Sequence, residues 1–214
     1  MPKNGALDLS VIIPVHNEEG NIEYLYKELK EAINFSKRYE MIFVDDGSRD
    51  NSFAILSRIA REDKNVKVVK LRGNYGQTVA MRAGLDVCSG EKIITMDGDG
   101  QHHPKYIIDF YKKLDVYDVV CNNRLNRRKK TTPLGNFLVR LLFKVPYRDS
   151  IGGMKGFTKK VKEEIYLYGN MHRYLPLLAR WRGFKVGEQE ISFLFRIQRG
   201  RATFLEVLGY LVWG

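Results

Sequence analysis

Short apolar runs alternate with amphipathic helical patterns along the first half of the chain. Each run is rich in β-branched residues and is closed by a polar or glycine-containing segment, which is typical of buried strands. Between the runs, apolar residues recur every three or four positions, as on one face of a helix. The predicted strands are Ser10–Val15, Met41–Val44, Val66–Leu71, Ile93–Met96 and Asp118–Asn122, and the predicted helices begin near Asn21, Ser52 and Gly76.

This alternation predicts an α/β fold, with a mostly parallel sheet covered by helices on both faces. A length of 214 residues suits one domain, and a hydrophobic content of 44% is enough for its core. We expect neither a signal peptide nor a membrane-spanning segment. Residues 1–10 lack a cationic region followed by an apolar one, and no apolar stretch reaches about 18 residues.

The net charge of +11 indicates an anionic partner. Nucleic acid, an acidic membrane surface and phosphorylated small molecules all satisfy this condition. Cys88 and Cys121 form no recognisable motif, which favours a reducing compartment.

Two carboxylates follow the predicted strand that ends at Met96. Asp97 and Asp99 stand in the sequence Met-Asp-Gly-Asp-Gly-Gln, at the carboxyl end of that strand. Ligands of open α/β sheets bind beyond such strand ends, and Mg²⁺ is commonly held by one or two carboxylates plus substrate phosphates. The pair therefore predicts a site for a metal and a diphosphate, although alone it also fits an acidic turn with two glycines.

Polar clusters follow two other predicted strands, at residues 14–18 and 45–48. Parallel strands end at the same edge of a sheet, so we expect the three clusters to form one nucleotide-binding cleft. The alternative for residues 45–48 is a turn and a helix cap. The chain has no G-x-x-x-x-G-K-[ST] phosphate loop and no G-x-G-x-x-G after its first strand, which argues against a dinucleotide-binding Rossmann site.

These segments resemble family 2 glycosyltransferases of the GT-A fold, and within them the branch of dolichol-phosphate mannose synthases and undecaprenyl-phosphate sugar transferases. The similarity extends from about residue 9 to about residue 203. Two departures are Gly73, where the branch often has arginine, and Ala202-Thr203, where a serine-lysine pair is common. The similar segments are residues 11–19 (VIIPVHNEE), 44–48 (VDDGS), 74–77 (NYGQ), 97–102 (DGDGQH), 149–150 (DS), 153–157 (GMKGF), 171–176 (MHRYLP) and 181–184 (WRGF).

The resemblance implies an inverting enzyme that moves a sugar from GDP-mannose or a UDP-sugar to dolichyl or undecaprenyl phosphate. It also implies a role for each matching residue. The nucleoside would lie against Pro14, Asn17, Glu18, Asp45 and Asp46. Asp97, Asp99 and Gln101 would hold Mg²⁺ or Mn²⁺, and Arg124 would reach the diphosphate. Arg128 and Thr132 would bind the acceptor phosphate. The expected catalytic residues are therefore Asp97, Asp99 and Arg124.

The residues themselves also favour a phosphate acceptor. A hydroxyl acceptor needs a base, and no further lone carboxylate or histidine stands out for that task. A lipid phosphate is already anionic at neutral pH and needs cations instead. The run from Arg124 to Lys130 supplies them, although such a run also fits a solvated or nucleic-acid-binding loop. We expect His172 and Arg173 to order the acceptor side or its helix, with direct phosphate contact as the less favoured alternative.

We expect a catalytic domain over residues 1–203 and an apolar segment over residues 204–214, which is an interfacial helix or the start of a membrane region. Apolar residues recur at helical spacing between Leu134 and Val145, beside the basic run. They fit either a membrane-surface helix or a core helix. The expected location is the cytoplasmic face of a membrane, with an NDP-sugar and a polyprenyl phosphate as partners.

Three other functions remain open at this point. A nucleotidyltransferase also uses paired aspartates and Mg²⁺, but the first loop lacks the expected glycine-rich, basic pattern. A family 2 enzyme could act on a sugar hydroxyl in polysaccharide synthesis. A nucleic-acid-binding protein would explain the net charge but not the acidic strand ends, so we expect no nucleic-acid partner.

Overall fold

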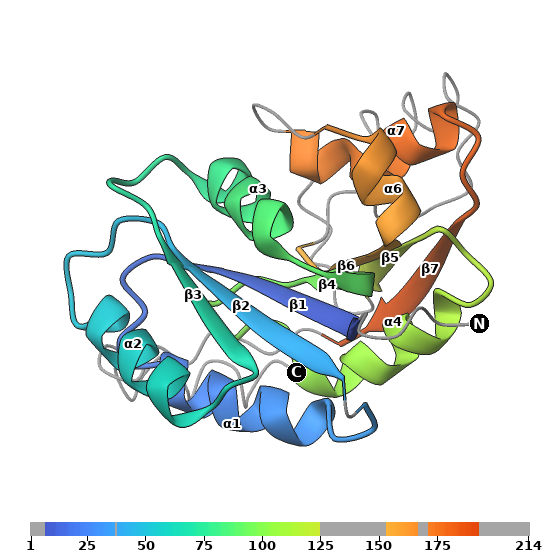
Figure 1. Ribbon diagram of the computed structural model, residues 1–214. Helices are drawn as coiled ribbons and strands as arrows, with labels where there is room; N and C mark the ends of the chain where they lie inside the picture. The colour runs from blue at the N-terminus through green and yellow to red at the C-terminus, as the bar shows by residue number, and fades with distance from the viewer. Residues whose placement is uncertain (1–6, 37, 125–152, 167–170, 193–214) are drawn as a thin grey trace, which may run out of the picture.

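A seven-stranded sheet forms the middle of the molecule (Figure 1). The computed structural model describes residues 7–36, 38–124, 153–166 and 171–192. The strands are β1 (Leu7–Val15), β2 (Tyr39–Asp45), β3 (Val66–Lys70), β4 (Gly90–Thr95), β5 (Val119–Arg124), β6 (Lys155–Thr158) and β7 (Val186–Ile191). Their order is β3-β2-β1-β4-β6-β5-β7. Among them β6 runs antiparallel to β4 and β5, and the other neighbours pair in parallel, as the sequence predicts.

Helices cover both faces of this sheet (Figure 1). One face carries α1 (Ile22–Ala32), α2 (Ser52–Glu62) and α4 (Ile107–Lys113), and the other carries α3 (Gln77–Val87), α6 (Lys159–Glu164) and α7 (Leu175–Trp181). Two 3₁₀ turns, η1 (Pro104–Tyr106) and η2 (Met171–Tyr174), lead into α4 and α7.

The strands are apolar on both sides because both sides are buried. In β1, Val11 and Ile13 belong to the core beneath α1 and α2, whereas Ile12 belongs to the core beneath α3, and all three are fully buried. Successive side chains of a strand point to opposite faces. A sheet covered on both faces therefore requires the nearly continuous apolar runs that mark these strands in the sequence.

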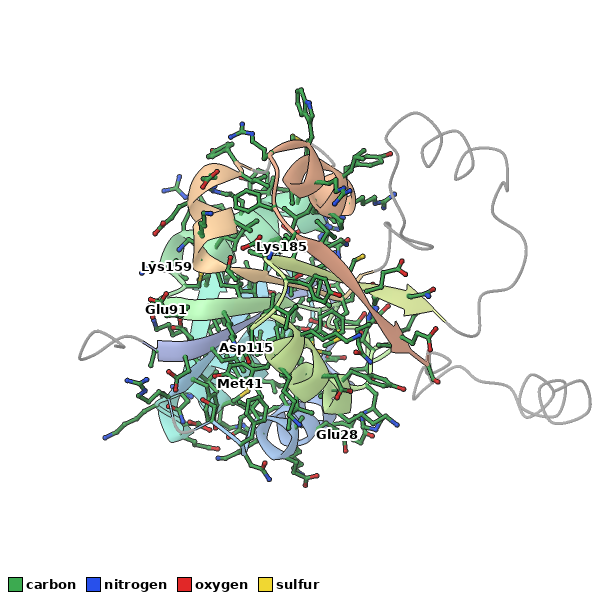
Figure 2. All side chains as sticks on the ribbon, turned by 90° about the vertical axis from the view of Figure 1, so that its right-hand side faces the viewer. Glu28, Met41, Glu91, Asp115, Lys159 and Lys185 are labelled. Carbon is green, nitrogen blue, oxygen red and sulfur yellow. The ribbon has the colours of Figure 1, made fainter. Side chains whose placement is uncertain are left out.

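Helix α3 lies unusually close to the sheet, and this closeness depends on Gly84. A Cβ atom at this position would lie 2.5 Å from Ile12 Cγ2 and 3.2 Å from Val44 Cγ2. On the same face, the Lys159 Nζ atom of α6 lies 3.4 Å from Glu91 Oε1 at the start of β4 (Figure 2).

A buried carboxylate joins the amino-terminal parts of the central strands. Glu40 Oε1 accepts hydrogen bonds from Ser10 Oγ at 2.6 Å and from the Ser89 N–H at 2.7 Å, and Glu40 Oε2 lies 2.6 Å from Lys67 Nζ. Burial alone would raise the pKa of Glu40, but Lys67 and the hydrogen bonds outweigh burial and lower it. The carboxylate is therefore ionised and holds β1, β2 and β3 together with the residue before β4.

All five predicted strands are present, with ends shifted by a few residues. The sequence patterns did not predict β6, β7, α4, α6 or α7. In the part of the chain that the structure describes, no helix has the length and apolar character needed to cross a bilayer. The basic run after Arg124, the apolar pattern over residues 134–145 and the segment 204–214 lie outside the described residues.

Candidate active site

A pocket of about 280 Å³ lies beyond the carboxyl ends of β1, β2 and β4. All three predicted polar clusters contribute to it. Its lining includes five of the predicted site residues together with Gln77 from the first turn of α3. The lining residues are Pro14, Val15, His16, Glu18, Asp46, Gln77, Asp97, Gly98 and Asp99.

Asn17 joins the loops that follow β1 and β2. Its backbone has a positive φ of 54°, a conformation in which asparagine is enriched. The Asn17 N–H donates to Ser48 Oγ at 3.0 Å, and Asn17 Oδ1 accepts from the Arg49 N–H at 2.8 Å. The Glu18 N–H donates in turn to Ser52 Oγ at 2.9 Å. Asn17 is exposed and does not line the pocket, so its contact with a nucleoside stays a prediction.

The two neighbouring aspartates after β2 face different surroundings. Asp45 is fully buried and does not line the pocket; its Oδ1 accepts from the Ser48 N–H at 3.3 Å. Asp46 lines the pocket and holds the loop before α3: Oδ1 accepts from the Tyr75 N–H and Oδ2 from the Gly76 N–H, both at 2.8 Å. The nucleoside contact predicted for Asp45 therefore stays a prediction, and Asp46 has a structural task in addition to its place in the pocket.

Asp97 is packed tightly at the pocket wall. Its Oδ1 accepts a hydrogen bond from Gln77 Nε2. A Cβ atom on Gly153 would lie 2.0 Å from Asp97 Oδ2, so the Gly153 backbone lies directly against the carboxylate. Burial raises the pKa of Asp97, and Lys155, the Gln77 hydrogen bond and Arg173 counteract this only in part. A bound cation would favour the ionised form.

Asp99 is half-buried, and its Oδ1 accepts from the Gln101 N–H at 3.1 Å. His102 is buried, and its Nδ1 lies 3.7 Å from Asp97 Oδ2. Gln101 does not line the pocket, so its role as a metal ligand stays a prediction.

The oxygen donors of the pocket fit a hard divalent cation that substrate phosphates help to bind. Among the described residues, no group of three or more His, Cys, Asp or Glu side chains is arranged to enclose a metal ion. Asp97 and Asp99 would supply carboxylate oxygens, and a diphosphate and water would complete the coordination. Mg²⁺ sites in proteins commonly have this composition.

A second group of polar side chains joins α3 to η2. His172 of η2 is buried, and its Nδ1 forms a 2.5 Å hydrogen bond with Thr78 Oγ1 in the first turn of α3. Burial, and then the charges of Lys155 and Arg173, lower the pKa of His172 to about 4. The imidazole is therefore neutral at physiological pH.

The sequence patterns assign no function to Gln77, Thr78 or Lys155. Gln77 and Lys155 belong to segments that carry the resemblance, NYGQ and GMKGF, which was the signal available in the sequence. Arg124 is the last residue of β5, but its side chain lies outside the described part. Arg128 and Thr132 also lie outside it, so the roles of all three stay predictions.

An open, mostly parallel sheet with an acidic pocket at its carboxyl edge defines an α/β fold of the nucleotide-binding type. A mannosyltransferase from Pyrobaculum calidifontis, solved with GDP-Man and Mn²⁺, has a TM-score of 0.69 and 16% identity over 94% of this chain and 62% of its own. Glucosyl-3-phosphoglycerate synthase from Mycobacterium tuberculosis, solved with Mn²⁺, UDP and glucosyl-3-phosphoglycerate, has a TM-score of 0.70 and 18% identity. The match covers 96% of this chain and 75% of the synthase chain. The fold is thus the GT-A glycosyltransferase fold, as the resemblance implied.

The family model described as glycosyl transferase family 2 matches residues 10–171. Dodecaprenyl-phosphate galacturonate synthase from Rhizobium johnstonii is 33% identical over 80% of this chain and 54% of its own length. Undecaprenyl-phosphate 4-deoxy-4-formamido-L-arabinose transferase from Pseudomonas fluorescens is 34% identical over 80% of this chain and 52% of its own length. The chain belongs to glycosyl transferase family 2, and it spans about half the length of these two relatives.

Proposed function

We propose that the chain is the catalytic part of an inverting glycosyltransferase that moves a sugar from a nucleoside-diphosphate sugar to a polyprenyl phosphate. The observation that carries this proposal is that Asp97 and Asp99 line the same pocket as Pro14, Glu18 and Asp46. The names of the two curated relatives, which both specify a polyprenyl-phosphate product or substrate, support this class of acceptor.

The reaction needs few proton transfers. An oxygen of the acceptor phosphate attacks the anomeric carbon, the bond from that carbon to the diphosphate breaks, and the nucleoside diphosphate leaves with the electron pair. A divalent cation on Asp97 and Asp99 would stabilise the charge of the leaving group, and Mn²⁺ in the two related crystal structures supports its use. Glu18 and Asp46 supply acceptor oxygens at the nucleoside end of the pocket.

A panel of GDP- and UDP-sugars with a polyprenyl phosphate, with and without EDTA, tests this function. We expect one donor to give a glycolipid and EDTA to stop its formation. Asp99→Asn should abolish turnover because it removes one ligand charge, whereas Asp86→Asn, on the exposed end of α3, should not. Pyrophosphate release from a nucleoside triphosphate, or sugar transfer only to a hydroxyl, would contradict the proposal.

We propose that this reaction takes place at the cytoplasmic face of a membrane and that the face formed by α6 and α7 lies against the lipid. Trp181 is 82% exposed and Tyr166 is 63% exposed, and the bond from Arg182 Nη1 to Glu164 O keeps the ends of the two helices together at 3.0 Å. Residues 153–186 contain eight Lys and Arg but two Glu. Exposed aromatic rings among basic residues suit an anionic membrane surface.

A further inference from the structure

The first turn of α3 holds two parts of the site at once. Gln77 donates to the carboxylate of Asp97, and Thr78, the next residue, is hydrogen-bonded to His172. Thr78 and His172 are each 5% exposed, so water does not compete strongly for their bond. The 3₁₀ turn η2 is therefore fixed, through one helical turn, at a defined place beside Asp97.

This arrangement brings Arg173 to the site. Arg173 follows His172 directly, is exposed, and forms no hydrogen bond or ion pair with the described residues. Thr78, which holds His172, is the chain neighbour of Gln77, which donates to Asp97, so Arg173 belongs to a turn that is held beside this carboxylate. Unlike the residues of the β1, β2 and β4 loops, Arg173 does not line the pocket assigned to the donor.

A second positive charge comes from β6. Lys155 is opposite Thr95 in the pairing of β6 with β4. Asp97 follows two residues after Thr95, just beyond the end of β4, and the charge of Lys155 acts on its carboxylate. Lys155 is 1% exposed, and His172 adds no charge because its imidazole is neutral. Two cations outside the pocket lining, Lys155 and Arg173, thus act on Asp97.

We propose that Arg173 binds the phosphate of the acceptor beside Asp97, and that the hydrogen bond between Thr78 and His172 positions it for this contact. The inference rests on the proposed function and adds to it a further residue that holds the attacking group, beside the predicted Arg128 and Thr132. An arginine fork suits the terminal oxygens of a phosphate monoester, and η2 offers this fork from outside the donor pocket. The donor diphosphate also carries phosphate groups that an arginine could bind, so the experiment must distinguish the acceptor phosphate from the donor diphosphate.

Steady-state kinetics of Arg173→Gln, Arg173→Lys and the control Arg61→Gln test the assignment. Arg61 is an exposed arginine in the last turn of α2, which covers the opposite face of the sheet from η2. Arg173→Gln should raise the KM for polyprenyl phosphate by about 10- to 100-fold, as expected for the loss of a charged hydrogen bond. It should leave the KM for the NDP-sugar close to the wild-type value, and Arg173→Lys should restore part of the loss.

The positioning role has its own test. Thr78→Val removes the hydroxyl with little change of shape, and Thr78→Ser keeps the hydroxyl. We expect Thr78→Val to raise the KM for the lipid phosphate while the KM for the donor stays unchanged, and Thr78→Ser to restore it. Equal effects of the two substitutions, or a change in thermal stability without a change in KM, would contradict the positioning role.

The outcomes separate this inference from the function on which it rests. If the wild-type chain forms glycolipid and Arg173→Gln behaves like Arg61→Gln, the assignment of Arg173 is wrong and the proposed function stands. If only the KM for the donor rises, Arg173 binds the diphosphate and the acceptor assignment is wrong. If the wild-type chain makes no glycolipid from any donor, the proposed function fails, and this inference fails with it.

Discussion

Asp46→Asn should cost both stability and activity, because the carboxylate of Asp46 holds the loop before α3. Its two oxygens accept the N–H groups of Tyr75 and Gly76 at 2.8 Å each, and the side chain is 5% exposed. An amide has one oxygen and one NH₂ group, so one loop N–H would face another donor. Hydrogen bonds to charged groups contribute about 1.5–3 kcal/mol each, and an unsatisfied buried N–H costs about 1–3 kcal/mol.

The expected loss in the free energy of unfolding is therefore about 2–4 kcal/mol, measured by urea unfolding at neutral pH with circular dichroism. Asp99→Asn is the matched control, because Asp99 lies in the same pocket but is half-buried and holds only the Gln101 N–H. It should abolish turnover and cost less than about 1 kcal/mol. If both variants are equally stable, the loop does not depend on Asp46 and the reasoning is refuted.

Three further predictions concern other parts of the chain. Gly153→Ala would place a Cβ atom 2.0 Å from Asp97 Oδ2. The displacement of this carboxylate should lower kcat by about 100-fold. A folded variant with the wild-type kcat would contradict the close approach of Gly153 to Asp97. Glu40→Gln should lower the free energy of unfolding by about 1–2 kcal/mol at neutral pH. Because the pKa of Glu40 is lowered in the folded state, its contribution is present above the unfolded pKa of about 4.3 and is lost as the pH falls through the folded pKa. Urea titrations at several pH values should therefore show the difference from wild type shrinking in acid, and a constant difference would count against the ion pair. Trp181→Ser should weaken binding to anionic vesicles, measured by co-sedimentation, by roughly tenfold. The control Tyr24→Ser replaces an exposed aromatic residue of α1 on the opposite face and should leave vesicle binding unchanged. Equal effects of the two substitutions would contradict the proposed membrane face.

The strands of the first half could be predicted because each is an uninterrupted apolar run buried on both faces. The two strands that pattern analysis missed lack this feature. β6 has four residues, Lys-Gly-Phe-Thr, and its buried lysine reads as a surface position. β7 is an edge strand, Val-Gly-Glu-Gln-Glu-Ile, whose polar residues are typical of a loop. In both strands, pairing with β5 rather than local sequence determines the extended conformation.

The site residues also divide into those that the sequence predicts and those that it does not. Asp97 and Asp99 were identifiable because they follow a strand directly and adjacent carboxylates need a reason to remain ionised. The contact of Gln77 with Asp97 spans 20 residues, and that of Thr78 with His172 spans 94. No periodicity in the sequence encodes such contacts. Asp45 and Asp46 look equivalent as a pair of carboxylates, yet Asp45 is the fully buried last residue of β2, whereas Asp46, just beyond the strand, lines the pocket.

The distribution of charge follows from the need to bring two anions together. Two unit charges 4 Å apart repel by about 4 kcal/mol at an effective dielectric constant of 20. An acceptor phosphate beside a donor diphosphate therefore requires cations that the donor has not already used. The pocket proposed for the donor is acidic, with Glu18, Asp46, Asp97 and Asp99, whereas Lys155 and Arg173 do not line it and carry positive charges that act on Asp97. The proposed function thus places Asp97 between an acidic donor half, where a metal cation would balance the charge, and an acceptor half in which Lys155 and Arg173 would supply positive charge.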